Sequence, residues 1–260
     1  PVQIINLEKS SNRMKNFYNI EGKYKRFNAV DGNNIINYDE YERTILETID
    51  NYPVCLGEIG CKLSHSRIWR SITENTIILE DDVHMPTNDV IETISRLKIP
   101  SDCDIIYIGG TWNDGYGPGT ACTWDNHVLT SERFEKCYIK TDTENLFRRK
   151  SQILDESNIH PFDFHGFRCL GSYVVTTKGA QKLTKLISDN TITDRPFITE
   201  AVDNWIIRMG NRSKINIYEH FPHLVTQIWN PEDTNILRLE TPVFKLKRKT
   251  VKFLGPEYWW

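Results

Sequence analysis

Short apolar-rich runs alternate along this chain with segments whose apolar residues recur at helical spacing. Runs without helical spacing occur at 2–7, 25–30, 77–79, 105–108, 173–175 and 215–218. Continuous apolar runs are typical of strands that are covered on both faces of a parallel sheet. Residues 57–72, 178–187 and those following 199 carry apolar side chains every three or four positions, which predicts helices. Strands alternating with helices predict an α/β protein with a mostly parallel central sheet.

Capping and turn residues set several of the predicted boundaries. Ser10 or Ser11 is placed to cap the first helix, and Thr199 is placed to cap the last one. Gly109 and Gly110 follow the apolar run at 105–108 and are expected to end that strand.

Two regions lack this regular pattern. Residues 111–168 contain Trp112, Tyr116 and Trp124 among glycines and polar residues, which predicts an insertion or an active-site loop region. The aromatic residues would form a lid or acceptor platform, or else the core of the insertion. Residues 236–260 form a C-terminal extension with a basic run at 245–249, interpreted as a solvated strand or a docking segment for an acidic partner. We expect one domain over residues 1–260.

Composition narrows the functional classes. The 260 residues are 39% hydrophobic and 26% charged, which is typical of a globular domain. A net charge of −3 argues against a nucleic-acid-binding protein. No apolar run approaches the roughly 20 residues of a transmembrane helix, so none is expected, and the compartment stays open. The six cysteines form no CxxC pair, and Cys61 and Cys103 are predicted to be buried thiols.

The segment Leu79-Glu80-Asp81-Asp82 carries the clearest chemistry. It ends a buried strand, and ligands of open α/β sheets bind beyond the carboxyl ends of strands. Packed carboxylates repel one another and are costly to desolvate, and a divalent cation removes both penalties. Oxygen ligands suit Mg²⁺ or Mn²⁺, which also bridge to phosphates. The alternative interpretation is a solvated acidic turn after a strand.

Several further blocks follow one another in a fixed order. They are Ile5-Asn6-Leu7, Val30-Asp31-Gly32, GEIGC-x-LSH at 57–65, ILEDD at 78–82, DIIYIG at 104–109, YVVTTKGA at 173–180 and Val202-Asp203. Together with the DxD-type spacing of Glu80 and Asp82, the series resembles glycosyltransferase family 25 across residues 4–235. That family includes bacterial lipooligosaccharide galactosyltransferases and animal procollagen galactosyltransferases.

The resemblance implies a GT-A-type, Rossmann-like nucleotide-sugar transferase fold. It also implies a UDP-sugar donor and Mn²⁺, with Mg²⁺ as the alternative ion. The acceptor would be a hydroxyl group of a glycan or of a collagen-like hydroxylysine.

Metal and catalytic roles can be placed on four residues. Glu80 and Asp82 are predicted metal ligands, and Gln227 lies near the late position at which many GT-A enzymes have a histidine ligand. Asp203 is the predicted general base, because the first turn of a helix favours an ionised carboxylate. The alternatives are a helix-start acid without another role at Asp203, and Glu200 as the base.

The predicted donor-binding set comes from the same blocks. Its members are Asn6, Leu7, Asp31, Gly32, Lys62, Ser64, Glu80 and Asp81. Ordinary strand termination or a turn would also explain the first four. His65 lies on the apolar stripe of its helix, so a core histidine and a site residue are both open.

The main functional hypothesis is an inverting, metal-dependent transfer of galactose or glucose from UDP to a hydroxyl acceptor. One alternative is a metal-dependent phosphohydrolase built on the same carboxylates, although the sequence lacks a second Asp/His cluster. Another is a non-catalytic nucleotide-binding module of the same fold.

Overall fold

The computed structural model describes residues 1–32, 42, 56–85, 87, 89–112, 159–161, 167–189, 197, 200–220, 224–227, 245–246 and 249–250. The strands of the main sheet are β1 (Val2–Asn6), β2 (Lys25–Asn28), β3 (Thr76–Glu80), β4 (Val83–His84), β5 (Ile105–Trp112), β6 (Ile159–Pro161), β7 (Phe167–Val175), β8 (Ile217–His220) and β9 (Val225–Gln227). The helices are η1 (Glu8–Ile20), α2 (Leu56–Ser71), α3 (Val90–Ser95), α6 (Thr177–Ser188) and α7 (Val202–Asn211).

The main sheet has the strand order β2-β1-β3-β7-β5-β8-β6, with β9 pairing with β5 and with β4. Strands β1, β2, β3, β5, β8 and β9 run in one direction, whereas β4, β6 and β7 run against them. The predicted α/β class with a mostly parallel, Rossmann-like sheet is therefore confirmed. The antiparallel position of β7, between β3 and β5, was not predicted.

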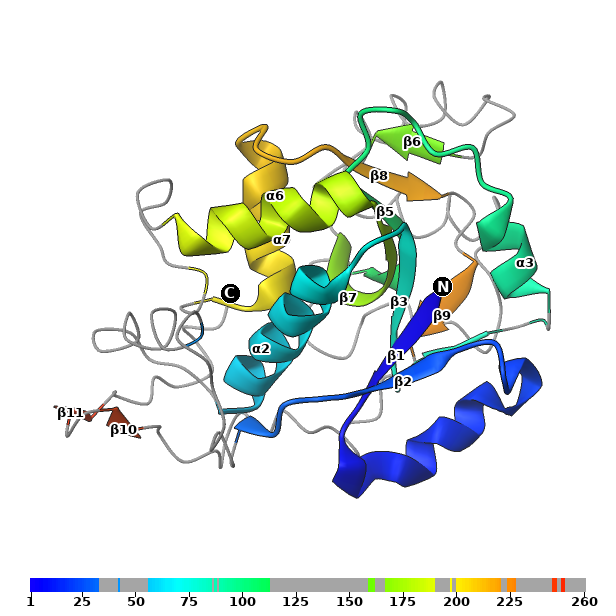
Figure 1. Ribbon diagram of the computed structural model, residues 1–260, viewed down its shortest axis with the longest axis horizontal. Helices are drawn as coiled ribbons and strands as arrows, with labels where there is room; N and C mark the ends of the chain where they lie inside the picture. The colour runs from blue at the N-terminus through cyan, green and yellow to red at the C-terminus, as the bar shows by residue number, and fades with distance from the viewer. Residues whose placement is uncertain are drawn as a thin grey trace.

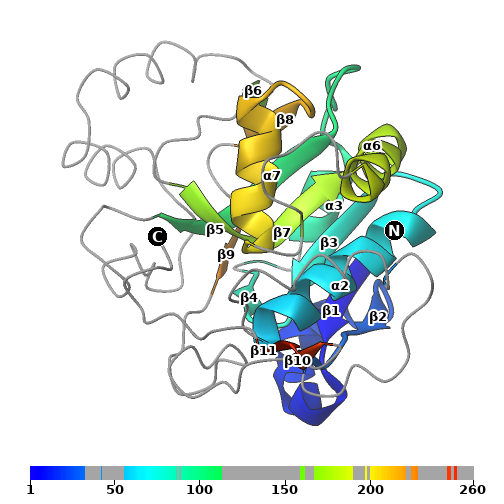
Figure 2. The same cartoon turned by 90° about the vertical axis from the view of Figure 1, so that its left-hand side faces the viewer.

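Alternate residues of the central strands divide between two apolar layers. Ile78 and Ile105 pack with α2, α6 and α7, whereas Ile77 and Ile106 pack with η1 and α3. Figure 1 shows the first group of helices to the left of the sheet and the second to the right, and Figure 2, seen from the left-hand side, shows α2, α6 and α7 in front of the strands. Successive side chains of a strand point to opposite faces, so each central strand supplies both layers.

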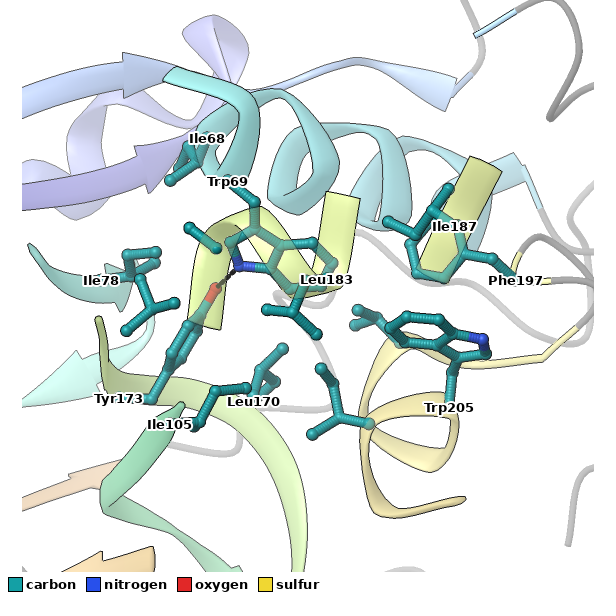
Figure 3. Close-up of a cluster of buried hydrophobic side chains, with 14 of the residues drawn as sticks. Ile68, Trp69, Ile78, Ile105, Leu170, Tyr173, Leu183, Ile187, Phe197 and Trp205 are labelled. Carbon is teal, nitrogen blue, oxygen red and sulfur yellow. Dashed lines mark hydrogen bonds between the residues drawn. The ribbon is translucent and has the colours of Figure 1, made fainter. Parts of the chain in front are cut away.

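Aromatic residues form the centre of the layer beside α2 (Figure 3). The rings of Trp69 and Trp205 are stacked with centroids 6.5 Å apart, and Phe197 meets Trp205 edge-on at 4.8 Å. Trp69 Nε1 donates a hydrogen bond of 2.9 Å to Tyr173 Oη. Buried Trp and Tyr side chains need such partners, so this bond lets both rings lie fully inside the core.

The two predicted serine and threonine caps are wrong. η1 is a 3-10 helix that begins at Glu8, with Leu7 at its N-cap, and Ser10 is a kink inside it with φ −107° and ψ 26°. Asn6 Nδ2 donates to the Ser10 carbonyl oxygen at 2.9 Å, so a tertiary contact shapes this turn. α7 has Ala201 at its N-cap, which places Thr199 outside the helix start.

The glycine pair in β5 does not end the strand. β5 continues to Trp112 with register shifts, and Gly109 pairs with Val225 of β9. A Cβ on Gly109 would lie 2.1 Å from the Val225 carbonyl oxygen. The absence of a side chain therefore lets β9 approach β5.

Other expectations fall at the margins of the described chain. Tyr116 and Trp124 lie outside the described residues, as does most of the C-terminal extension. Within that extension, β10 (Lys245–Leu246) and β11 (Lys249–Thr250) pair in an antiparallel arrangement. Among the described helices, none is both long and apolar enough to cross a membrane.

Candidate active site

The acidic segment lies where the carboxyl ends of β1 and β3 meet. Because the two strands are parallel, with Ile5 opposite Glu80, Asn6 ends β1 directly beside the acids. The side chains of Glu80, Asp81 and Asp82 reach different partners, on α2, on β1 with η1, and on β9. The three consecutive acids therefore contact three different parts of the protein.

Glu80 points toward helix α2. It has the same strand parity as Ile78, whose side chain packs with α2. Its Oε1 lies 2.9 Å from His65 Nε2, and the Cys61 thiol donates to the same oxygen at 3.9 Å. Cys61 and His65 are four positions apart on α2, so both face the end of β3.

Asp81 is held inside the protein. Its carboxylate accepts hydrogen bonds from Asn6 Nδ2 at 2.6 Å and from Arg13 Nη1 at 2.9 Å. Burial raises the pKa of Asp81, while the Asn6 and Arg13 contacts act to lower it. Asn6 is itself fixed by Arg26 Nε, which donates to its Oδ1 at 2.8 Å. Both Asn6 and Asp81 therefore organise the strand ends, and their contact with a donor stays a prediction.

Asp82 and Gln227 face each other across β4 and β9. Val83 and Gln227 are register partners, and Gln227 Nε2 donates to Asp82 Oδ2 at 3.0 Å. Among the described residues, the remaining oxygens, Asp82 Oδ1 and Gln227 Oε1, are buried without a hydrogen-bond partner. Burial, followed by the charge of Glu80, raises the pKa of Asp82 to about 7.

This pair of oxygens fits a hard divalent cation. A buried acceptor without a partner costs roughly 1–3 kcal/mol, and a coordinated ion would remove that cost. Carboxylate and amide oxygens are ligands of the type that Mg²⁺ and Mn²⁺ accept. Asp82 and Gln227 therefore suit the predicted ion. Glu80 lies near enough for its charge to act on Asp82, but its Oε1 is turned to His65.

Asp203 approaches the same region from α7. It lies in the first turn of that helix, and its Oδ1 accepts a hydrogen bond from the Asn204 backbone N–H at 2.8 Å. Burial raises the pKa of the Cys61 thiol well above its usual value, and the charges of Glu80 and Asp203 raise it further. Cys61 is therefore close enough to both acids for their charges to act on it. Cys61 was predicted to be buried, but it is only partly buried.

Glu200, the second candidate base, is paired with Arg208 of α7. That ion pair is largely shielded from solvent. The carboxylate of Glu200 is thereby held against a cation, and its role as the alternative base stays a prediction.

The turn at Asp31-Gly32, called the DG turn below, packs against the first half of α2. A Cβ on Gly32 would lie 1.6 Å from the Leu56 carbonyl oxygen, and one on Gly60 would lie 2.5 Å from that of Val30. Ser64 Oγ accepts from the Val30 N–H at 2.8 Å and donates to the Gly60 carbonyl oxygen at 2.7 Å. Gly32 and Ser64 therefore have packing roles, and any contact with a donor stays a prediction.

Three further members of the predicted donor set lie around this unit. Asp31 forms a surface ion pair with Lys9 at 2.9 Å. Leu7 caps η1 through its backbone, and Lys62 is fully buried on α2. Donor binding by these residues also stays a prediction.

Two residues near the acids were missed or misjudged by sequence reasoning. Tyr173 is fully buried, and its hydroxyl lies 2.7 Å from His65 Nδ1. Arg13, which resembles a surface arginine in the sequence, is only 11% exposed in its side chain because it binds Asp81. The signal for Tyr173 was available, since a tyrosine inside a buried strand requires a polar partner.

One protein family matches most of this chain, and individual relatives match shorter stretches of it. The family described as glycosyltransferase family 25 (LPS biosynthesis protein) matches residues 1–206. Procollagen galactosyltransferase 2 of Mus musculus is 29% identical over 127 residues, which are 41% of this chain and 20% of that protein. A Haemophilus influenzae protein named as a glycosyltransferase is 27% identical over 140 residues, which are 52% of this chain and 38% of that protein.

A viral relative also matches only part of the chain. The procollagen lysyl hydroxylase and glycosyltransferase of Acanthamoeba polyphaga mimivirus is 30% identical over 98 residues, which are 32% of this chain and 11% of that protein. The chain thus spans well under half the length of each of these relatives. The family match contains α2, the acidic segment and Asp203, whereas Gln227 lies beyond it. Because residues 1–206 of the 260 match, the chain belongs to glycosyltransferase family 25.

Proposed function

We propose that this glycosyltransferase moves galactose or glucose from a UDP-sugar to a hydroxyl group and requires a divalent cation. The observation that carries the metal requirement is the pair of buried oxygens, Asp82 Oδ1 and Gln227 Oε1, which have no hydrogen-bond partner among the described residues. The names of the mouse and viral relatives support a collagen-like acceptor, and the family description supports a glycan of lipopolysaccharide.

Asp82 and Gln227 would hold the ion, and Glu80 would add negative charge beside it. Bound Mn²⁺ or Mg²⁺ supplies positive charge that stabilises the departing UDP. Asn6, Arg13 and Asp81 keep the acidic segment in place, since their side chains bond to one another at the strand ends.

Asp203 would accept the proton of the attacking hydroxyl group. Asp203 lies in the first turn of α7, at the positive end of the helix dipole. The charges of Glu80 and Asp203 both raise the pKa of Cys61, which supports placing the proposed base on the same side of the protein as the proposed metal region. A carboxylate on the acceptor side and a cation on the UDP side are the two groups that an inverting transfer needs.

Release of UDP tests this function directly. The purified chain would be incubated with UDP-galactose or UDP-glucose and a hydroxyl acceptor, with Mn²⁺, with Mg²⁺ or with a chelator. We expect turnover of one donor with Mn²⁺ and its loss with the chelator. Metal-independent turnover would contradict the metal requirement.

Two other outcomes would overturn the transfer itself. Phosphate release from simple phosphate esters would indicate a phosphohydrolase. Nucleotide binding without turnover of any sugar nucleotide, unchanged in Asp203→Asn, would indicate a binding module.

A further inference from the structure

A continuous chain of buried hydrogen bonds ends on Glu80. Trp69 Nε1 donates to Tyr173 Oη at 2.9 Å, Tyr173 Oη lies 2.7 Å from His65 Nδ1, and His65 Nε2 lies 2.9 Å from Glu80 Oε1. Trp69, Tyr173 and His65 are at most 2% exposed. The Glu80 side chain is 22% exposed, so this chain of bonds leads from the aromatic core to the edge of the site.

The Trp69 indole fixes the direction of the first bond, and the hydroxyl proton of Tyr173 then selects between two directions for the others. An indole N–H can only donate, so Tyr173 Oη accepts from Trp69. The phenol has one proton of its own, and His65 Nδ1 is its neighbour at hydrogen-bond distance. If Tyr173 donates to Nδ1, the ring proton of neutral His65 lies on Nε2 and is donated to Glu80 Oε1.

The opposite direction leaves a buried group unsatisfied. With a proton on His65 Nδ1, Tyr173 Oη would accept from both Trp69 and His65, and its own proton would lack a partner in this chain of bonds. An unsatisfied buried donor costs roughly 1–3 kcal/mol. Burial also raises the pKa of Tyr173 well above its usual value, so the phenol keeps the proton that it donates.

We propose that His65 is a positioning residue that holds Glu80 Oε1 and leaves Glu80 Oε2 for the metal-bound donor. Trp69 and Tyr173 fix His65 as its Nε2–H tautomer. The part concerning the donor rests on the function proposed above. A glutamate has three rotatable side-chain bonds, and immobilising it before the donor arrives removes an entropic cost from binding.

The same atoms also allow a rival arrangement. Cys61, His65 and Glu80 each offer one ligand atom, and these atoms lie within 4.8 Å of one another. A soft ion such as Zn²⁺ would suit the thiolate and imidazole. It would require Nε2 without a proton, which reverses the direction of donation and leaves the Tyr173 proton unsatisfied. The hydrogen-bond geometry therefore favours the positioning role.

Nitrogen NMR of the whole chain with ¹⁵N-labelled histidine reads the tautomer without any turnover. The chain has seven histidines, and His65→Gln identifies the His65 signals. We expect His65 to carry its proton on Nε2, and Tyr173→Phe to shift the Nδ1 resonance. Tyr107→Phe is the matched control, because Tyr107 pairs with Tyr173 across the sheet but is outside the bonds described above. A proton on Nδ1, or stoichiometric zinc on Cys61 and His65, would overturn the proposal.

Donor kinetics then test the consequence for Glu80. Loss of a residue that orients a metal-site carboxylate typically lowers metal affinity or activity about 10- to 100-fold. We expect a loss of this size in kcat/KM for the donor in His65→Leu, a smaller loss in Tyr173→Phe, and substantial rescue in His65→Gln, whose amide retains an N–H donor. Thermal unfolding reports the folded fraction of each variant.

The two proposals fail in different ways. Folded His65→Leu and Tyr173→Phe proteins with wild-type donor kinetics would overturn the positioning role while leaving the transferase function intact. Absence of turnover in the wild type would overturn the transferase function, and calorimetry of UDP with Mn²⁺ would then supply the affinity comparison among the same variants.

Discussion

Asp82 and Gln227 lie 145 positions apart in the chain, and their side chains are joined by a hydrogen bond of 3.0 Å. The pairing of β4 with β9 brings the two residues together. β9 is itself held in place by pairing with Gly109 and Gly110 of β5. The candidate metal site is therefore completed by β9, a strand that follows α7 in the chain.

Replacing Gln227 should weaken the ion without dismantling the fold. Gln227→Leu removes one buried oxygen, so we expect about 10-fold weaker Mn²⁺ binding by calorimetry. Gln227→His supplies a nitrogen ligand and should retain Mn²⁺-dependent activity. Gln181→Leu, an exposed change on α6, is the control and should leave the Mn²⁺ affinity unchanged. Equal affinity in wild type and Gln227→Leu would remove Gln227 from the site.

The raised pKa of Asp82 predicts a specific dependence of stability on pH. Burial raises this pKa from 3.8 in the unfolded chain to about 7, so between these values the folded state binds more protons than the unfolded state. The free energy of unfolding of the metal-free protein should therefore fall as pH rises through this window, by up to about 4 kcal/mol. Urea unfolding at pH 5 and pH 8 measures the part of this change that lies above pH 5, about 3 kcal/mol.

Two comparisons isolate Asp82 as the cause. Asp82→Asn should flatten this part of the pH profile, because the amide does not titrate. Saturating Mn²⁺ should stabilise the wild type more at pH 8 than at pH 5, since the ion requires the ionised carboxylate. A stability that rises with pH in the wild type and in Asp82→Asn alike would contradict the assignment.

Asp203→Asn should separate donor binding from catalysis. General-base catalysis typically contributes about 100- to 10,000-fold, so we expect kcat to fall within that range. The affinity for UDP with Mn²⁺ should change little, since Asp82 and Gln227 are untouched. Single-turnover transfer measures the chemical step. The comparison variant is Glu200→Gln, which breaks the ion pair with Arg208. It should lower the free energy of unfolding, while its kcat should fall less than that of Asp203→Asn.

Gly60→Ala should destabilise the protein through packing alone. The added Cβ would lie 2.5 Å from the Val30 carbonyl oxygen, so the DG turn and α2 would have to move apart. Overpacking of this kind typically costs about 1–3 kcal/mol, measurable by urea unfolding. Arg70→Ala, an exposed change in the last turn of the same helix, should cost less. A neutral Gly60→Ala would show that the contact is loose.

Much of the fold could be predicted from the sequence because β3 and β5 contain continuous apolar runs, and β7 ends in one at 173–175. The direction of β7 was not readable, since an apolar run such as 173–175 carries no information on whether its neighbours are parallel or antiparallel. The serine cap at the first helix was mispredicted because Asn6 takes the Ser10 carbonyl oxygen, a contact that depends on the end of β1.

The candidate site could be predicted only in part, because its contacts also depend on the tertiary structure. The strand-end position of Glu80, Asp81 and Asp82 follows from local pattern, but their separate partners depend on which face of the sheet each residue meets. His65 was left open between core and site, and it belongs to both: it is fully buried, and its ring bonds to Glu80. Periodicity alone does not separate these alternatives.

Trp112 at the end of β5 and Phe167 at the start of β7 are register partners. Strand β6 lies between them in the chain and pairs with β8, so the same interval also supplies a strand at the end of the sheet. A change of length in this interval therefore has to preserve both the junction of β5 with β7 and the pairing of β6 with β8. Glu80 at the end of β3 and Asp203 on α7 both lie outside the interval, so the elements that carry the proposed chemistry are separate in sequence from the segment that joins β5 to β7.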